Sequence, residues 1–230
     1  MFITVKIRSL VKPAIAVATV VLFASIVFFA FSGKSVGVLG PYNCQMLLID
    51  AGHGGVDGGA ISAEGVKESD VNLAIALRMS GLCDLVGIGH QLTRGSDVGC
   101  LESESYSEHD DLVARAQMAN SIPECVLISV HQNKYPSEIV RGAEIMYAET
   151  PGSKELGVIT QSNMVSALDP ENRRVAHSAP SQLLLTSSVN CPAILAECGF
   201  MSNPQEAGLL ADGNYQTKIA MTLIASYIQF

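Results

Sequence analysis

Basic residues are scarce in most of this sequence. It has 14 Lys and Arg against 22 Asp and Glu, and four of the bases precede the first acid. These four are Lys6, Arg8, Lys12 and Lys34. The remainder carries 10 bases against 22 acids, a net charge of −12, and no basic stripe. Because nucleic-acid binding depends on clustered Lys and Arg, this scarcity excludes nucleic acid as the expected partner.

Charge of either sign is missing from residues 14–31, which are almost entirely apolar and come after a short basic segment. As a helix, this run would be ~27 Å long, close to the ~30 Å hydrocarbon core of a bilayer. We expect an uncleaved anchor rather than a signal peptide cut near Ser32, and either one exports the rest of the chain. The predicted organisation is an N-terminal signal or membrane anchor (1–32), a glycine-rich linker (33–43) and one extracytoplasmic catalytic domain (44–230).

No C-x-x-C pair occurs, which argues against a thiolate zinc cluster. The chain also lacks internal repeats and low-complexity tracts. An even number of cysteines in an exported domain permits disulfides, but Cys83, Cys125 and Cys198 lie in apolar runs, where a free thiol behaves as a small hydrophobe. The six cysteines are Cys44, Cys83, Cys100, Cys125, Cys191 and Cys198.

Apolar runs of strand type alternate with helical patterns along the catalytic domain. Such alternation is typical of an α/β fold, here a mostly parallel, twisted sheet with helices on both faces. Strands are expected over residues 44–50, 90–93, 125–130, 142–148, 183–186 and 193–198. Helices are expected over residues 69–85 (capped by Ser69 or Asp70), 110–120, 153–168 and 214–229, with a long polar loop over residues 94–109.

Chemically capable side chains come after three of these strands. His53 lies in a glycine-rich loop after the first strand, while His131 and Glu197 stand at the carboxyl ends of two others; such ends meet at one edge of a sheet. Glu68 lies just ahead of the first helix. Two histidines and a carboxylate form a known catalytic zinc set, and a further carboxylate can accept a proton from water. The alternative is a set of solvated loop side chains.

Four blocks, taken together, resemble the signature blocks of zinc-dependent N-acetylmuramoyl-L-alanine amidases, which cut the bond between muramic acid and the peptide stem of bacterial cell walls. The blocks are residues 50–60, 67–68, 129–133 and 197–204. The resemblance implies one Zn²⁺ per chain, held by His53, Glu68 and His131, with Glu197 as the catalytic carboxylate. Ala51 and Cys198 depart from the usual pattern, but neither is an implied ligand.

The single anchor, the lack of wall-binding repeats and residues 182–185 look most like spore-cortex members of this family, which are linked to germination. The implied partners are peptidoglycan and, through the N-terminal helix, the membrane. A need for an accessory protein is left open. Thr93, Arg94 and residues 115–120 also resemble family positions, as parts of the scaffold.

Two other functions are consistent with parts of the sequence. A cysteine hydrolase would use Cys198, but the neighbouring Glu197 disfavours the thiolate that such an enzyme needs. A catalytically silent wall-binding or regulatory module would be expected to have lost a ligand or the base. All four of those positions are filled, so hydrolysis is the favoured prediction.

Overall fold

The computed structural model describes residues 45–101, 106–181 and 183–230. The anchor predicted over residues 1–32 and the linker over 33–43 lie outside these ranges. Within them, no helix has both the length and the apolar character needed to cross a bilayer.

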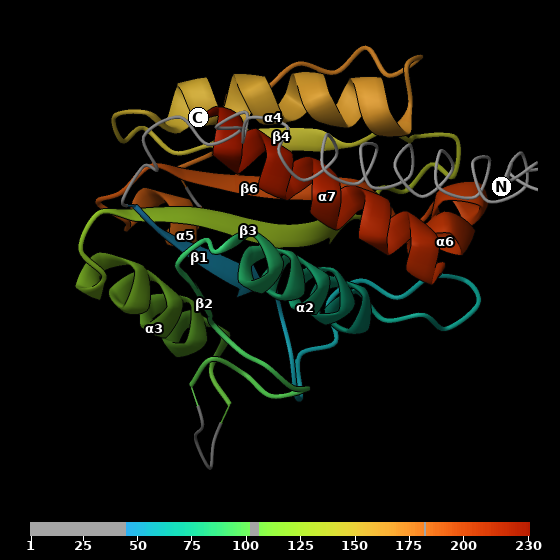
Figure 1. The fold of residues 1–230 in the computed structure, drawn as a ribbon. Coiled ribbons are helices and arrows are strands. Elements are labelled where there is room, and N and C mark those ends of the chain that lie inside the picture. Colours follow the sequence, from blue (N-terminus) through green and yellow to red (C-terminus); the bar gives the residue numbers. More distant parts are fainter. Residues whose placement is uncertain (1–44, 102–105, 182) are drawn as a thin grey trace, which may run out of the picture. The chain divides into compact units, whose positions relative to one another are not determined.

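A six-stranded sheet forms the centre of the domain, with strand order β2-β1-β3-β6-β4-β5 (Figure 1). β2, β1, β3 and β6 are parallel, whereas β4 runs antiparallel to β6 and β5 runs parallel to β4. The sheet is therefore mixed but mostly parallel, as the sequence predicts, and the antiparallel pairing of β4 with β6 is the one departure among the described strands. The strands are β1 (Met46–Ala51), β2 (His90–Leu92), β3 (Cys125–Asn133), β4 (Glu144–Tyr147), β5 (His177–Ser178) and β6 (Ala193–Phe200).

Helices cover both faces of the sheet, as the sequence predicts (Figure 1). α2, α4 and α7 pack together on one face, and α3 and α5 lie on the other, where α5 contacts β6. The helices are α2 (Glu68–Val86), α3 (Glu108–Ser121), α4 (Ser153–Leu168), α5 (Leu184–Ser187), α6 (Pro204–Leu210) and α7 (Gly213–Gln229).

Two hydrophobic cores result from the period-2 alternation of the strands. Leu47 and Ile49 of β1 enter the larger core beneath α2 and α7. Leu48, between them, enters the smaller core with Leu127 of β3. Asp50 is on the same face as Leu48, so this buried carboxylate lies on the α3 side of the sheet.

Several boundaries differ from the prediction. The strand expected over residues 183–186 is wrong: this short run forms the one-turn helix α5 and places Leu185 in the smaller core. A four-residue apolar run has no periodicity that separates helix from strand. The predicted cap of α2 is also wrong, because Lys67 occupies that position and Glu68 is the first helical residue.

The two central strands extend further than expected. β3 continues past residue 130 to Asn133, and β6 continues past residue 198 to Phe200. His131 therefore lies within the last residues of its strand rather than just beyond it, and Glu197 lies three residues before the end of its strand. Their backbone pairing fixes the positions of both side chains more firmly than a loop would.

Candidate active site and metal centre

The loop after β1 places His53 by means of unusual backbone angles. His53 itself has φ 61°, in the left-handed region that few non-glycine residues adopt. Gly52 and Gly59 allow close approach: a Cβ at Gly52 would lie 2.3 Å from the His131 ring, and one at Gly59 would lie 2.7 Å from both His53 and Glu68. The glycines predicted to shape this loop therefore make room for three converging side chains.

His53, Glu68 and His131 form a cluster in which one ligand atom from each lies within 4.8 Å of the others. Glu68 Oε1 is 3.2 Å from His53 Nε2 and 3.0 Å from His131 Nδ1. The three residues come from the loop after β1, the start of α2 and the end of β3. The structure thus brings together the three ligands that the sequence predicts.

Neighbouring groups hold both the histidine and the carboxylate in place. Asp57 Oδ2 lies 2.7 Å from His53 Nδ1, which turns His53 Nε2 toward Glu68. Glu68 Oε1 accepts hydrogen bonds from the Gln132 backbone N–H and the Asn72 amide, and Glu68 Oε2 accepts one from the Ala60 N–H. Asp57 and Asn72 are supporting residues that the sequence reasoning missed, since a polar residue in a glycine-rich loop or on a helix carries no distinctive signal.

Hydrogen bonds and charge interactions within the cluster shift the pKa values of His53 and Glu68 in opposite directions. Burial alone would lower the pKa of His53, but its hydrogen bonds and charge interactions with Glu68 and Asp57 raise that pKa to about 9. Burial opposes ionisation of Glu68, yet the hydrogen bonds from His131 and His53 hold its pKa well below the usual range. These interactions keep Glu68 ionised beside the two imidazoles.

Two arginines anchor the loop, in agreement with their expected scaffold role. Arg94 donates to the carbonyls of Ala51 and Gly52 and to that of Ser69. Arg115 is 2% exposed and donates to the carbonyls of Ala51 and His53, and its Nη1 lies 2.5 Å from Asp50 Oδ1. The position of His53 thus depends on a buried ion pair that spans β1 and α3.

Glu197 lies beside the cluster. It is the register partner of His131 across β3 and β6, and it shares with His53 and His131 the wall of a cavity of about 280 Å³. Its Oε2 is buried and has no hydrogen-bond partner among the residues that the structure describes. Burial is the main reason that the pKa of Glu197 rises to about 7. The carboxyl group therefore has a free proton-accepting atom.

Cys198 points away from this cavity. Its side chain is 1% exposed in the larger core, and burial, followed by the charge of Glu197, raises the pKa of its thiol. A reactive cysteine needs the opposite shift. These observations argue against the cysteine hydrolase considered above.

The donor set fits a zinc ion. Tetrahedral zinc with ligands at about 2.0–2.1 Å places neighbouring donors roughly 3.3–3.4 Å apart, close to the 3.0 and 3.2 Å separations at Glu68 Oε1. The link from Asp57 to His53 is also typical, since metal-bound histidines usually pair their second nitrogen with a carboxylate.

Comparisons with known proteins give a consistent result. The profile described as N-acetylmuramoyl-L-alanine amidase matches residues 47–229. A germination-specific N-acetylmuramoyl-L-alanine amidase of Bacillus subtilis (strain 168) is 29% identical over 195 residues, which cover 83% of this chain and 81% of that protein.

Solved structures agree in fold as well as in sequence. The CwlD amidase from Clostridioides difficile, solved in complex with the GerS lipoprotein, is 31% identical and superposes with a TM-score of 0.75, covering 80% of this chain and 97% of that one. An N-acetylmuramoyl-L-alanine amidase from Clostridium difficile 630 is 30% identical with a TM-score of 0.70, covering 81% of this chain and 96% of that one.

Proposed function

The chain belongs to the N-acetylmuramoyl-L-alanine amidase family, and on this basis we propose that it is a zinc hydrolase of spore-cortex peptidoglycan. The bond cleaved is the amide between N-acetylmuramic acid and L-alanine of the stem peptide. The observation that carries the mechanism is the convergence of His53, Glu68 and His131 beside the unpartnered Oε2 of Glu197.

His53 Nε2, Glu68 Oε1 and His131 Nδ1 would hold the metal. When bound, zinc would lower the pKa of a water and polarise the carbonyl that is attacked. Asp57 keeps His53 Nδ1 occupied, so that His53 Nε2 stays directed at the metal position. Glu68 contributes one oxygen to the cluster, while Ala60 fixes its other oxygen.

Glu197 is proposed as the general base and acid. Its carboxylate accepts the proton of the attacking water and then returns it to the departing nitrogen of L-alanine. The side chain of Glu197 lines the cavity that His53 and His131 share, and burial brings its pKa to about 7, near the pH at which a general base works best. Leu185 and Leu195 line the same cavity and would help to exclude water.

The proposed location and partners of the domain also follow from its membership of the amidase family. The domain is proposed to act outside the cytoplasm, anchored or exported by residues 1–32 and connected by the linker at 33–43. A relative whose structure was solved with a lipoprotein supports an accessory protein for this chain. The competing proposal is a catalytically silent wall-binding or regulatory module.

Digestion of purified peptidoglycan by the full chain, followed by mass analysis of the fragments, tests this proposal. The expected products are stem peptides with a free L-alanine amino group and glycan strands that keep intact muramic acid. Binding to the wall without release of peptides would support the silent module and contradict the hydrolase. Fragments cut within the glycan would contradict the assigned bond.

A further inference from the structure

Cys125 and Cys191 lie near the opposite end of the two strands that carry His131 and Glu197. The β3–β6 register begins at the pair of Leu127 and Ala193, and each cysteine lies two residues before its member of that pair. A backbone hydrogen bond of 2.9 Å from Leu127 N to Pro192 O holds this part of the ladder. Adjacent strands lie about 4.7–4.9 Å apart, within the roughly 4.4–6.8 Å that separates the Cα atoms of a disulfide.

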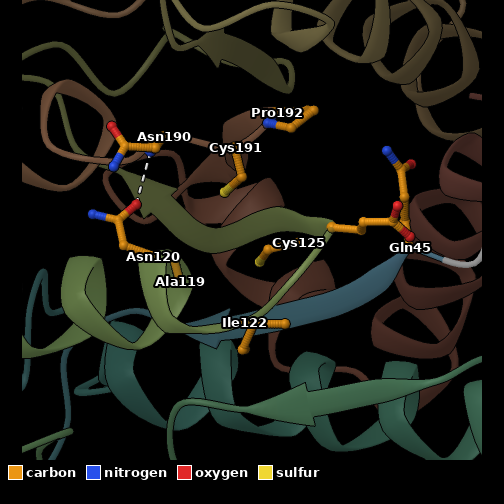
Figure 2. A pocket seen from close by; sticks show the side chains of 9 residues that line it. Gln45, Ala119, Asn120, Ile122, Cys125, Asn190, Cys191 and Pro192 are labelled. Carbon is orange, nitrogen blue, oxygen red and sulfur yellow. Dashed lines mark hydrogen bonds between the residues drawn. The ribbon is translucent and has the colours of Figure 1, made fainter.

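The two thiols lie in the same part of the interior. Both belong to the smaller core, and each shifts the pKa of the other. They also line a cavity of about 300 Å³, whose wall Figure 2 shows together with the two sulfur atoms. The exposed fraction is 3% for Cys125 and 8% for Cys191. A reagent that enters the cavity would therefore meet Cys191 more readily.

The two thiols are not equivalent. The interaction with Cys125 lowers the pKa of the Cys191 thiol, whereas the interaction with Cys191 and burial raise the pKa of the Cys125 thiol, and Cys191 is also the more exposed of the two. A thiolate is the attacking species in thiol–disulfide exchange. Cys191 is therefore the better nucleophile of the pair, and Cys125 is the resolving thiol.

We propose that Cys125 and Cys191 are a modification site that a small-molecule or protein disulfide oxidises to an intramolecular disulfide. Cys191 Sγ attacks one sulfur of the oxidant and releases the other as a thiol. Cys125 Sγ then attacks Cys191 Sγ and releases the second thiol. One disulfide is formed and one is consumed, and the two thiol protons leave with the two reduced products.

Such a bond would brace the catalytic strand pair from its far end. Cys125 precedes His131 by six residues, and Cys191 precedes Glu197 by six, so the cross-link would fix the same register that pairs His131 with Glu197. The proposal goes beyond the amidase reaction and does not depend on it. Its consequence is resistance to unfolding.

Mapping of the thiols in the full chain, purified in mild detergent, tests the site directly. The protein is treated with glutathione disulfide, quenched in acid, denatured, alkylated, digested and analysed by mass spectrometry. We expect a reducible link between the peptides that contain Cys125 and Cys191, with Cys83 and Cys198 alkylated. Recovery of Cys125 and Cys191 as alkylated thiols, or linked to other cysteines, would overturn the proposal.

Variants separate the roles of the two thiols. Cys125→Ser should stop at a glutathione adduct on Cys191, whereas Cys191→Ser should accumulate far less adduct; the reverse order would overturn the assignment of the nucleophile. Oxidation should raise the thermal unfolding midpoint of the wild type and of the control Cys83→Ala, but not of Cys125→Ala/Cys191→Ala. A cross-linked wild type with an unchanged midpoint would overturn the bracing role.

Discussion

His131 and Glu197 are register partners on adjacent parallel strands, one in the metal-ligand cluster and the other with a free buried oxygen. This backbone pairing sets the spacing between the proposed metal position and the proposed base without any direct bond between the two side chains in the described structure. A catalytic centre built on paired strands is more rigid than one built on loops. His53 and Glu68 complete the cluster from a loop and a helix start.

Replacing His53 with Ala should empty the metal site. The change removes one of three donors and leaves the carboxylate of Glu68 with less positive charge around it. Zinc content, measured by elemental analysis of the purified protein, should fall from one ion per chain to near zero. His109→Ala, at an exposed position on α3, is the matched control and should keep its zinc. Full occupancy in His53→Ala would contradict the ligand assignment.

Removing the carboxylate of Asp57 should weaken metal binding without abolishing it. Asp57→Ala frees His53 Nδ1, so the ring loses its fixed orientation. Changes of this kind typically cost about 10–100-fold in metal affinity, measurable by competition with a chelator. Tyr106→Phe removes only the hydroxyl that donates to Asp57 Oδ2 and should have a smaller effect. Equal affinities for wild type and Asp57→Ala would show that Asp57 does not orient the ring.

A methyl group at Gly52 should disturb His131 directly. The new Cβ would lie 2.3 Å from the His131 ring, so the ring or the loop must move. We expect a loss of about 1–3 kcal/mol in the free energy of unfolding, typical of overpacking, together with weaker zinc binding. Gly81→Ala is the control, since no atom lies within 4 Å of its Cβ. In the interior of α2 it should stabilise by roughly 0.5–1 kcal/mol.

The buried pair of Asp50 and Arg115 should make stability depend on pH. Burial opposes ionisation of Asp50, but Arg115 and the hydroxyls of Ser129 and Thr93 hold its pKa below the ordinary value of 3.8. Because the pKa of Asp50 is lower in the folded state, ionised Asp50 contributes its full stabilisation above its pKa in the unfolded chain, about 3.9. That contribution is lost as the pH falls through the lower pKa of the folded state.

The Asp50→Asn variant measures this effect. It should lower the free energy of unfolding at pH 7 by about 1–3 kcal/mol, because Arg115 loses one of its two buried carboxylate partners and keeps the other, Asp111. The difference from wild type should shrink as pH falls below about 4, the range in which the wild-type carboxylate also loses its charge. Urea denaturation at several pH values gives both quantities. A difference that stays constant down to about pH 2 would contradict the assigned role of Asp50.

Much of the fold was predictable because local patterns determine it. The apolar run before His131 and the helix over residues 153–168 are strong periodic signals, and strand–helix alternation predicted a covered sheet. The direction of β4 was not predictable, because a strand's pattern of apolar residues does not encode which way its neighbour runs. β5 has only two residues, too few for any period.

The candidate site was also predictable only in part. Residues that end apolar strands, such as His131 and Glu197, stand out because polar side chains come directly after buried runs. Asp57 does not stand out, since a carboxylate in a polar loop is ordinary; its contact with His53 depends on the positive φ of that histidine. Tyr106, just before α3, donates a hydrogen bond to Asp57 Oδ2, a contact between segments 49 residues apart that no local pattern predicts.

Glu197→Gln tests the central claim most directly, because it separates metal binding from proton transfer. Glutamine keeps the volume of the side chain and one acceptor oxygen but cannot take a proton from water. Zinc content and the rate of stem-peptide release are measured on the same preparation. The account predicts full zinc occupancy with a rate reduced by about 10²–10⁴. Near-normal turnover with zinc retained would contradict Glu197 as the base, and loss of zinc would make it a ligand instead.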